Sequence, residues 1–228
     1  MNLSQTEQHE FKPGIATVYK NRTPLEVEVS NTGTGNTGPL QAELSGTGKD
    51  KFQLEFHNVL FSDLKKGEKA RFTVAPKNGL DPGVYEATVT LSGAKVESRS
   101  FSVKFVVNHL YGISLDRKGI YKFTPAVAGY GGQEPVTVKV ANTGTGDTGE
   151  LDVKLLGVNA NKFTLSKTKL DNIQRGESAE FTVVPKTGLT PGTYTAEVAV
   201  SSGNPDIATK GFKVSFVVKE AQIGRAHV

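Results

Sequence analysis

The chain has 228 residues, with 27 Lys and Arg against 23 Asp and Glu, and it contains no cysteine. The lack of cysteine excludes disulfides, thiol catalysis and cysteine-based metal sites. The small positive surplus is spread along the chain and few of the basic residues are arginine, so we expect a solvated surface and no nucleic-acid partner. The 25 glycines and 10 prolines suit the many turns of an all-β protein.

An internal repeat organises the chain, because the eight residues 31–38 return almost unchanged as 142–149. A stretch with three glycines is neither a strand nor a helix interior, so its duplication marks a turn that two folding units both need. The repeat therefore predicts two modules of about 110 residues. We expect the turn to join two antiparallel strands, with the glycines supplying positive φ and the asparagine capping it. Its structural residues are then Asn31, Gly33 and Gly38, and Asn142, Gly144 and Gly149.

Apolar residues alternate with polar ones in short segments throughout both modules, the period of a strand with one buried face. No segment has the pattern of a helix. In the first module these segments are 25–30, 40–44, 52–56, 70–74, 85–91 and 101–107, with a further strand near Leu3. In the second they are 136–140, 151–155, 163–165, 179–183, 194–200 and 212–218, with a further strand near Leu115.

Each module has a Pro-Gly pair just before its most regular strand, Pro82-Gly83 and Pro191-Gly192. Proline at i+1 and glycine at i+2 predict a type II turn. A tyrosine, Tyr85 or Tyr194, opens the strand that follows. Its position just past a corner is similar to the tyrosine corner of immunoglobulin-like sandwiches, whose hydroxyl bonds back to the corner backbone.

About seven short strands in each module, separated by regular turns, predict an all-β protein of two tandem Greek-key β-sandwiches, with a closed barrel as the alternative. We place the modules at residues 2–108 and 109–220. The order Val-x-Val-x-Asn-Thr-Gly, Leu-x-Gly, Phe-x-Leu and Phe-Thr-Val-x-Pro-Lys-x-Gly-Leu-x-Pro-Gly-x-Tyr-x-Ala-x-Val resembles tandem Ig-like repeats of bacterial surface and secreted multidomain proteins. It is more distantly similar to hydin/abnormal-spindle-type Ig-like domains. The resemblance implies a fold and no catalytic residues.

The junction and the end of the chain carry two further expectations. Residues 107–112 join the modules with no Ser/Pro-rich spacer, so we expect limited swivel. The final residues 223–228 resemble the translation of a sequencing adapter, and we expect 221–228 to be an artefactual or disordered tail. The missing signal and anchor then say nothing about the natural protein.

Catalytic and metal-binding constellations are not evident in the sequence. None of the four histidines, His9, His57, His109 and His227, has a counterpart in the other module. Asp147, Thr148 and Glu150 suggest a cation loop, but the first module has Asn36 and Pro39 in place of the two acids, and calcium needs six or more oxygen ligands. We therefore expect no enzyme, no cofactor and no metal.

The sequence favours a monomeric, extracellular or cell-surface spacer that positions neighbouring domains of a larger chain. Two ligand-binding alternatives remain. A carbohydrate module would need exposed aromatic rings, and Tyr19 and Tyr130, at equivalent positions before a strand, are the candidates for such a patch. An adhesin would instead bind a host protein or a polysaccharide.

Overall fold

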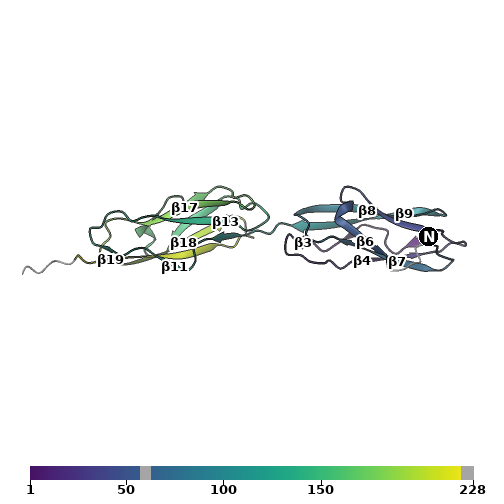
Figure 1. Cartoon of the computed structure of the whole chain (residues 1–228), viewed down its shortest axis with the longest axis horizontal. Coiled ribbons are helices and arrows are strands. Elements are labelled where there is room, and N and C mark those ends of the chain that lie inside the picture. The colour runs from purple at the N-terminus through teal and green to yellow at the C-terminus, as the bar shows by residue number, and fades with distance from the viewer. Residues whose placement is uncertain (57–62, 222–228) are drawn as a thin grey trace, which may run out of the picture. The chain divides into compact units, whose positions relative to one another are not determined.

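The computed structural model describes residues 1–56 and 63–221, and its contacts divide the chain into two units, Met1–Leu110 and Tyr111–Val228 (Figure 1). The sequence-based boundary lay between residues 108 and 109. Each unit consists of β-strands, and the described helical segments are two 3₁₀ turns, η1 (Lys49–Lys51) and η3 (Ala160–Lys162). No helix in the described ranges has the length and apolar character needed to span a membrane.

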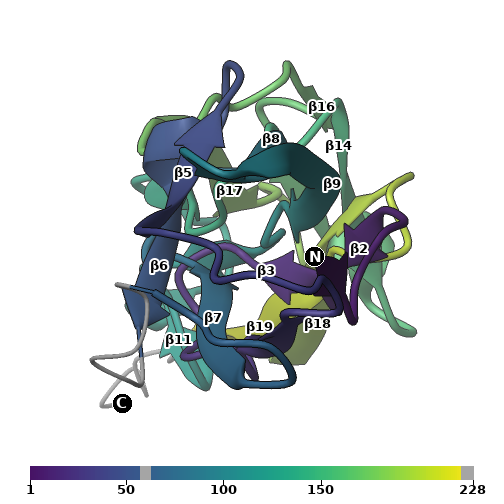
Figure 2. The same ribbon diagram turned by 90° about the vertical axis from the view of Figure 1, so that its right-hand side faces the viewer.

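The first module is built from two sheets. One has the strand order β1-β4-β7-β6 and the other β2-β9-β8-β5, with β3 also paired to β9. In Figure 2, β8 and β9 lie in the layer above β7. The bounds are β1 (Asn2–Leu3), β2 (His9–Glu10), β3 (Gly14–Ile15), β4 (Leu25–Ser30), β5 (Leu40–Ser45), β6 (Phe52–Phe56), β7 (Lys69–Pro76), β8 (Gly83–Gly93) and β9 (Val96–Asn108).

The second module repeats this plan. One sheet has the order β10-β13-β17-β15 and the other β11-β19-β18-β14-β16, with β12 also paired to β19. The bounds are β10 (Ile113–Leu115), β11 (Ile120–Lys122), β12 (Ala126–Val127), β13 (Val136–Asn142), β14 (Leu151–Leu156), β15 (Phe163–Leu165), β16 (Lys169–Leu170), β17 (Ser178–Pro185), β18 (Gly192–Ser202) and β19 (Lys210–Lys219).

The strand orders are those of an Ig-like sandwich. Taken as A, B, C, D, E, F and G along the first module, β1, β4, β7 and β6 give the A-B-E-D sheet, and β5, β8 and β9 give the C-F-G sheet. The predicted fold class, two tandem Greek-key β-sandwiches, is confirmed.

The alternating residues fill the space between the two sheets of each module, as the period of two requires. Val27 and Val29 of β4, with Phe105 of β9 across the sandwich, have no exposed surface. Phe181 and Phe216 are equally buried in the second module, at 2% and 0% exposure. Each module thus has its own apolar core.

The duplicated stretch connects two strands that belong to opposite sheets. Residues 31–38 leave β4 in one sheet and enter β5 in the opposite sheet, and residues 142–149 connect β13 to β14 in the same way. The flanking strands are not hydrogen-bonded to each other, so neither stretch is the turn of a hairpin. Each stretch is a crossover that closes one end of a sandwich.

The N-terminal segment of each module also crosses between sheets. In the first module, β1 is antiparallel to β4, whereas β2 and β3 are parallel to the last strand, β9. In the second, β10 pairs with β13, and β11 and β12 lie parallel to β19. Several of these strands have two residues, too few to show a period of two in the sequence.

Candidate functional site

The duplicated crossover holds a cluster of buried polar groups, and Asn31 is its centre in the first module. The side chain is 3% exposed. Its Nδ2 donates to the carbonyl oxygens of Gly35 at 2.7 Å and Leu64 at 2.8 Å, and its Oδ1 accepts from the Gly33 amide at 3.0 Å. One side chain therefore ties the crossover both to itself and to the segment that precedes β7.

Asn142 has the same role in the second module. It is 6% exposed, and its Nδ2 donates to the carbonyl oxygens of Gly146 and Ile173, each at 2.9 Å. Its Oδ1 accepts from the Gly144 amide at 2.8 Å. Both buried side-chain amides therefore donate to, and accept from, backbone groups of their own module. These hydrogen bonds stabilise the fold.

A buried threonine strengthens the same connection in each copy. The Thr37 amide donates to the Leu64 carbonyl at 3.0 Å, and the Leu64 amide donates to Thr37 Oγ1 at 2.9 Å. Thr148 and Ile173 make the equivalent bonds at 3.2 and 3.0 Å. From the sequence, Thr37 had no predicted role and Thr148 was considered only as part of a cation loop, although their identity in the two repeats was a visible signal of a shared structural role.

The acid and the amide at the edge of the crossover exchange places between the modules. In the first, Asn36 Nδ2 donates to Asp63 Oδ2 at 3.0 Å, and the Gly38 amide donates to Asp63 Oδ1 at 2.8 Å. In the second, Asn172 Nδ2 donates to Asp147 Oδ2 at 3.2 Å, and the Gly149 amide donates to Asn172 Oδ1 at 2.9 Å. Asp147 thus has an amide partner.

Glycine has two different uses in the crossover. Gly38 and Gly149 have φ of 68° and 66°, in the left-handed region that favours glycine. Positive φ is not found at Gly33 or Gly144. At Gly33 a Cβ would lie 3.3 Å from Asn31 Oδ1. The prediction of positive φ therefore holds for the last glycine of each stretch, while Gly33 and Gly144 serve as amide donors to the central asparagine.

The Pro-Gly pairs do not form the predicted type II turn. Gly83 and Gly192 have φ of 159° and 157°, nearly extended, and each is the first residue of a strand, β8 or β18. A type II turn needs φ of about 80° at this position. The left-handed residues of the connection are Gly79 and Gly188, at 74° and 71°. Pro82 and Pro191 therefore lead directly into the strand.

The tyrosines that follow make the bond expected of a tyrosine corner. The Tyr85 hydroxyl donates to the Asp81 carbonyl at 2.7 Å, and the Tyr194 hydroxyl donates to the Thr190 carbonyl at 2.8 Å. Burial raises the pKa of Tyr85, with a smaller contribution from the charge of Asp81. Each hydroxyl fixes the corner that precedes the second-to-last strand of its module, β8 or β18.

Tyr19 and Tyr130 are placed for packing, not for stacking a sugar. Tyr19 is edge-on to Phe105 at 5.3 Å, and its hydroxyl donates to the Lys77 carbonyl at 3.0 Å. Tyr130 is edge-on to Phe216 at 5.2 Å, and its hydroxyl donates to the Lys186 carbonyl at 2.6 Å. Burial also raises the pKa of Tyr130. Both rings are therefore half-buried at the edge of a core.

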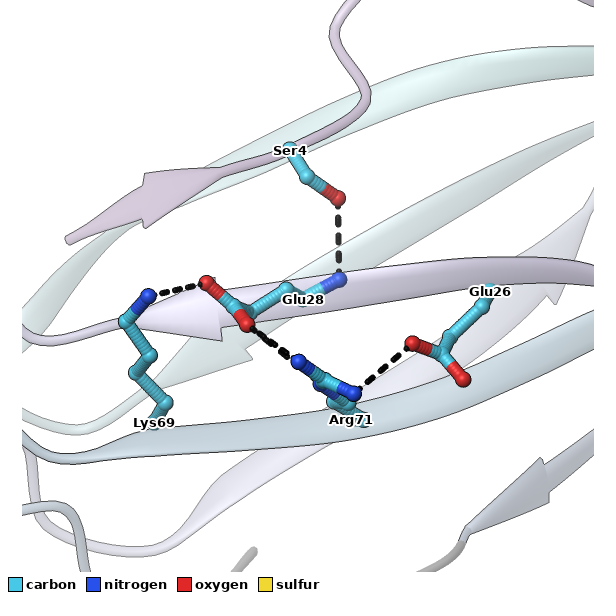
Figure 3. Close-up of polar contacts among 5 residues, drawn as sticks. All are labelled: Ser4, Glu26, Glu28, Lys69 and Arg71. Atoms are coloured by element: carbon cyan, nitrogen blue, oxygen red, sulfur yellow. Dashed lines mark hydrogen bonds and ion pairs between the residues drawn. The ribbon is translucent and has the colours of Figure 1, made fainter.

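A charged cluster crosses the outer face of β4 and β7 (Figure 3). Glu28 pairs with Lys69 at 2.6 Å and with Arg71 at 3.0 Å, and Arg71 reaches Glu26 at 3.1 Å. Hydrogen bonds from Lys69 and Arg71 lower the pKa of Glu28. These are cross-strand neighbours on a solvated sheet face, where such pairs stabilise strand pairing modestly.

The histidines and acids considered as ligands are not brought together. His9 packs edge-on against Phe11 at 4.6 Å, and burial lowers its pKa. His57, His227 and the tail 223–228 lie outside the described residues. Glu150 pairs with Lys169. Among the described residues there is no group of three or more His, Asp or Glu side chains that could hold a metal ion.

Comparison with known proteins agrees with the fold. Residues 120–208 match the model of the CARDB domain, an Ig-like domain of bacterial surface proteins. No curated protein matches the chain significantly. The second module is thus similar to CARDB domains, and the chain is a tandem pair of Ig-like modules.

Solved structures resemble the chain at low identity. The PapD-like domain 7 of human CEP192 is 15% identical with a TM-score of 0.37, covering 48% of this chain and 87% of that one. The protocadherin gammaB7 EC3–6 structure is 13% identical with a TM-score of 0.46, covering 97% and 47%. Zebrafish RET cadherin-like domains 1 to 4 are 11% identical with a TM-score of 0.37, covering 83% and 42%. The chain spans about half the length of the two cadherin-type structures.

Proposed function

We propose that the chain is a non-catalytic spacer, a pair of Ig-like modules within a larger bacterial cell-surface or secreted protein, where it positions the neighbouring domains. The observation that carries this proposal is the use of the duplicated crossover. Its buried asparagines, Asn31 and Asn142, each direct three hydrogen bonds to backbone groups of their own module. The feature that the two copies share most closely is therefore committed to holding the sandwich closed.

The titratable groups support a non-enzymatic role. The shifted pKa values belong to partners of exposed ion pairs, such as Glu28, Lys104 and Lys169, to His9, and to tyrosines at the sandwich edges. Catalytic acids and bases usually need a cleft in which burial and a specific charge act together. The similarity of residues 120–208 to CARDB supports an extracellular location.

The short junction supports the spacer role as well. β9 ends at Asn108 and β10 begins at Ile113. We propose that so short a connection limits the swivel between the modules, which small-angle scattering of the whole chain would measure. A narrow distribution of dimensions is expected, and a distribution as broad as that of two freely jointed modules would contradict this part of the proposal.

A surface-display experiment tests the function. The chain is placed between a cell-wall anchor and an epitope tag, and antibody access to the tag is measured on intact cells. Access should fall when one module is deleted and should return when an unrelated Ig-like module of equal length replaces it. Unchanged access after deletion would contradict the proposal.

The carbohydrate alternative has a separate test. Because Tyr19 and Tyr130 are packed against the cores, we expect a glycan array to give no selective signal. A selective signal that persists in a well-folded sample would instead favour a lectin.

A further inference from the structure

The second module has an open groove between the edges of its two sheets. The groove has a volume of about 720 Å³ and is lined from both sides, by β14 and the segment around β16 on one side and by β15 on the other. Its apolar lining includes Leu155 and Leu165, both half-buried, and Leu156, which is 46% exposed. All of these residues lie within the second module.

Both walls of the groove present strand edges. On β15, the Ser166 amide donates to Thr182 of β17, so alternation turns the backbone groups of Leu165 away from β17. On β14, the Val153 amide donates outward to Thr168, so the backbone groups of Leu155 also point outward, beyond the two-residue pairing with β16. An exposed edge of this kind is a template for one more strand.

The groove is rimmed by positive charge. Its lining contains three lysines, Lys154, Lys169 and Lys186, and one acid, Asp152. Lys154 pairs with Asp152 and Lys169 with Glu150, both in exposed positions where ion pairs are weak and exchange easily. Lys186 forms no ion pair within the described ranges.

The first module provides an internal comparison. When the modules are aligned on Gly157 and Gly46, which follow β14 and β5, Leu156 corresponds to Ser45 and Val158 to Thr47. Val158 is 95% exposed and Leu156 is 46% exposed. Leu156 lines the groove and Val158 lies outside its lining, so one position of the groove is apolar in the second module where the first has a hydroxyl.

We propose that this groove binds an extended polypeptide segment of another protein, with alternating aliphatic and acidic residues, by adding it as a strand beside β15 or β14. The strand edges supply backbone hydrogen bonds, Leu155 and Leu165 receive the aliphatic side chains on the core-facing side, and the lysines face the acidic ones. The spacer role does not depend on this binding.

The probe is a fluorescent hexapeptide of alternating valine and glutamate, titrated with the whole chain and followed by anisotropy, with a valine–lysine hexapeptide beside it. Lys186→Glu should weaken binding of the acidic probe by about tenfold, because it reverses a facing charge, whereas Leu156→Ser, on the outer face of β14, should change binding little. Leu156→Ser introduces the residue that the first module already has. Lys77→Glu is the matched control, since Lys77 follows β7 as Lys186 follows β17.

Hydrogen exchange supplies a second readout. The acidic probe should slow exchange of the Leu155 or Leu165 amide and leave the β5 and β6 amides of the first module unchanged. Any of four results would overturn the proposal: no binding, equal binding of the lysine probe, an equal loss in Lys77→Glu, or no protection at either leucine. Concentration-dependent dimerisation through these edges would assign the groove to a second copy of the chain and would also overturn it.

Discussion

The two modules place one carboxylate and one primary amide at the same corner, with the partners exchanged. Asn36 meets Asp63 in the first module, and Asp147 meets Asn172 in the second. In both cases the side chain preceding the E strand also accepts a bond from the last glycine of the crossover. The corner therefore requires an oxygen that accepts the hydrogen bond of the glycine amide, and a carboxylate paired with an amide. Either of the two paired positions can carry the carboxylate.

The outer faces of the sheets show the same exchange of sign. Glu28 on β4 lies opposite Arg71 on β7, whereas Lys139 on β13 lies opposite Glu180 on β17. Cross-strand neighbours interact through their complementarity, so a pair can be reversed without loss of strand pairing. In the first module the pair extends into a cluster, through Glu26 and Lys69.

The largest effect is expected where the two modules are the same. Asn31→Ala and Asn142→Ala each remove three hydrogen bonds and leave buried backbone groups unsatisfied, so each should lower the free energy of unfolding of its module by about 3–5 kcal/mol. Urea unfolding with hydrogen exchange assigns the loss to a module. The exposed Thr34→Ala is the control, and a loss below about 1 kcal/mol in the asparagine variants would refute the central role of the amide.

A smaller loss is expected at the tyrosine corners. Tyr85→Phe and Tyr194→Phe keep the ring and remove the hydroxyl bond to the corner carbonyl, so each should destabilise its module by about 1 kcal/mol. Tyr194 also contacts Thr190 Oγ1 at 3.1 Å. Thermal unfolding of both variants and of Thr190→Val compares the two corners, and unchanged stability in both phenylalanine variants would show that the corners need only the ring.

The exchanged pair can be tested by making the exchange. Asn36→Asp sets a second carboxylate beside Asp63 and should destabilise the first module by about 0.5–1 kcal/mol at neutral pH. Asn36→Asp with Asp63→Asn recreates the arrangement of the second module and should restore stability. A double variant no better than the single one would mean that each copy requires its own charge placement.

The smallest change in stability is expected from the charged cluster around Glu28, and it should depend on pH. Lys69 and Arg71 lower the pKa of Glu28 below 4.5, so its contribution is present above pH 4.5 and is lost as the pH falls through the lowered pKa. Glu28→Gln should flatten the acid side of the stability profile of the first module and leave the second unchanged. About 1 M salt should reduce the difference between the wild type and the variant. An identical acid profile in both proteins would show that the cluster contributes nothing.

The strands were predictable because each has one buried and one solvated face. Apolar residues such as Val27 and Val29 therefore alternate with polar ones along the sequence. The sheet to which a strand belongs leaves no such local trace, so the sequence did not show that residues 31–38 pass from one sheet to the other. Two-residue strands such as β2 and β16 are shorter than the pattern that would reveal them.

Some of the site was within reach of the sequence and some was not. Counting back from Gly67 and Gly176 aligns Leu64 with Ile173 and Asp63 with Asn172, which would have identified the partners of the crossover. The Pro-Gly pair indicated a φ of about 80° at Gly83. Gly83 has φ of 159°, and the left-handed φ of 74° is at Gly79, four residues earlier. Tyr19 and Tyr130 could be recognised as equivalent from sequence, but only the edge-on contacts with Phe105 and Phe216 show that they are structural.

The parallel pairing of first and last strands has a mechanical consequence. β2 and β3 lie parallel to β9, with His9 beside Val103 and Ile15 beside Asn108. Tension that pulls the two ends of a module apart would draw these strands in opposite directions along their length. It would therefore load their hydrogen bonds together in shear, rather than opening them one by one, and β11 and β12 against β19 give the second module the same resistance to force.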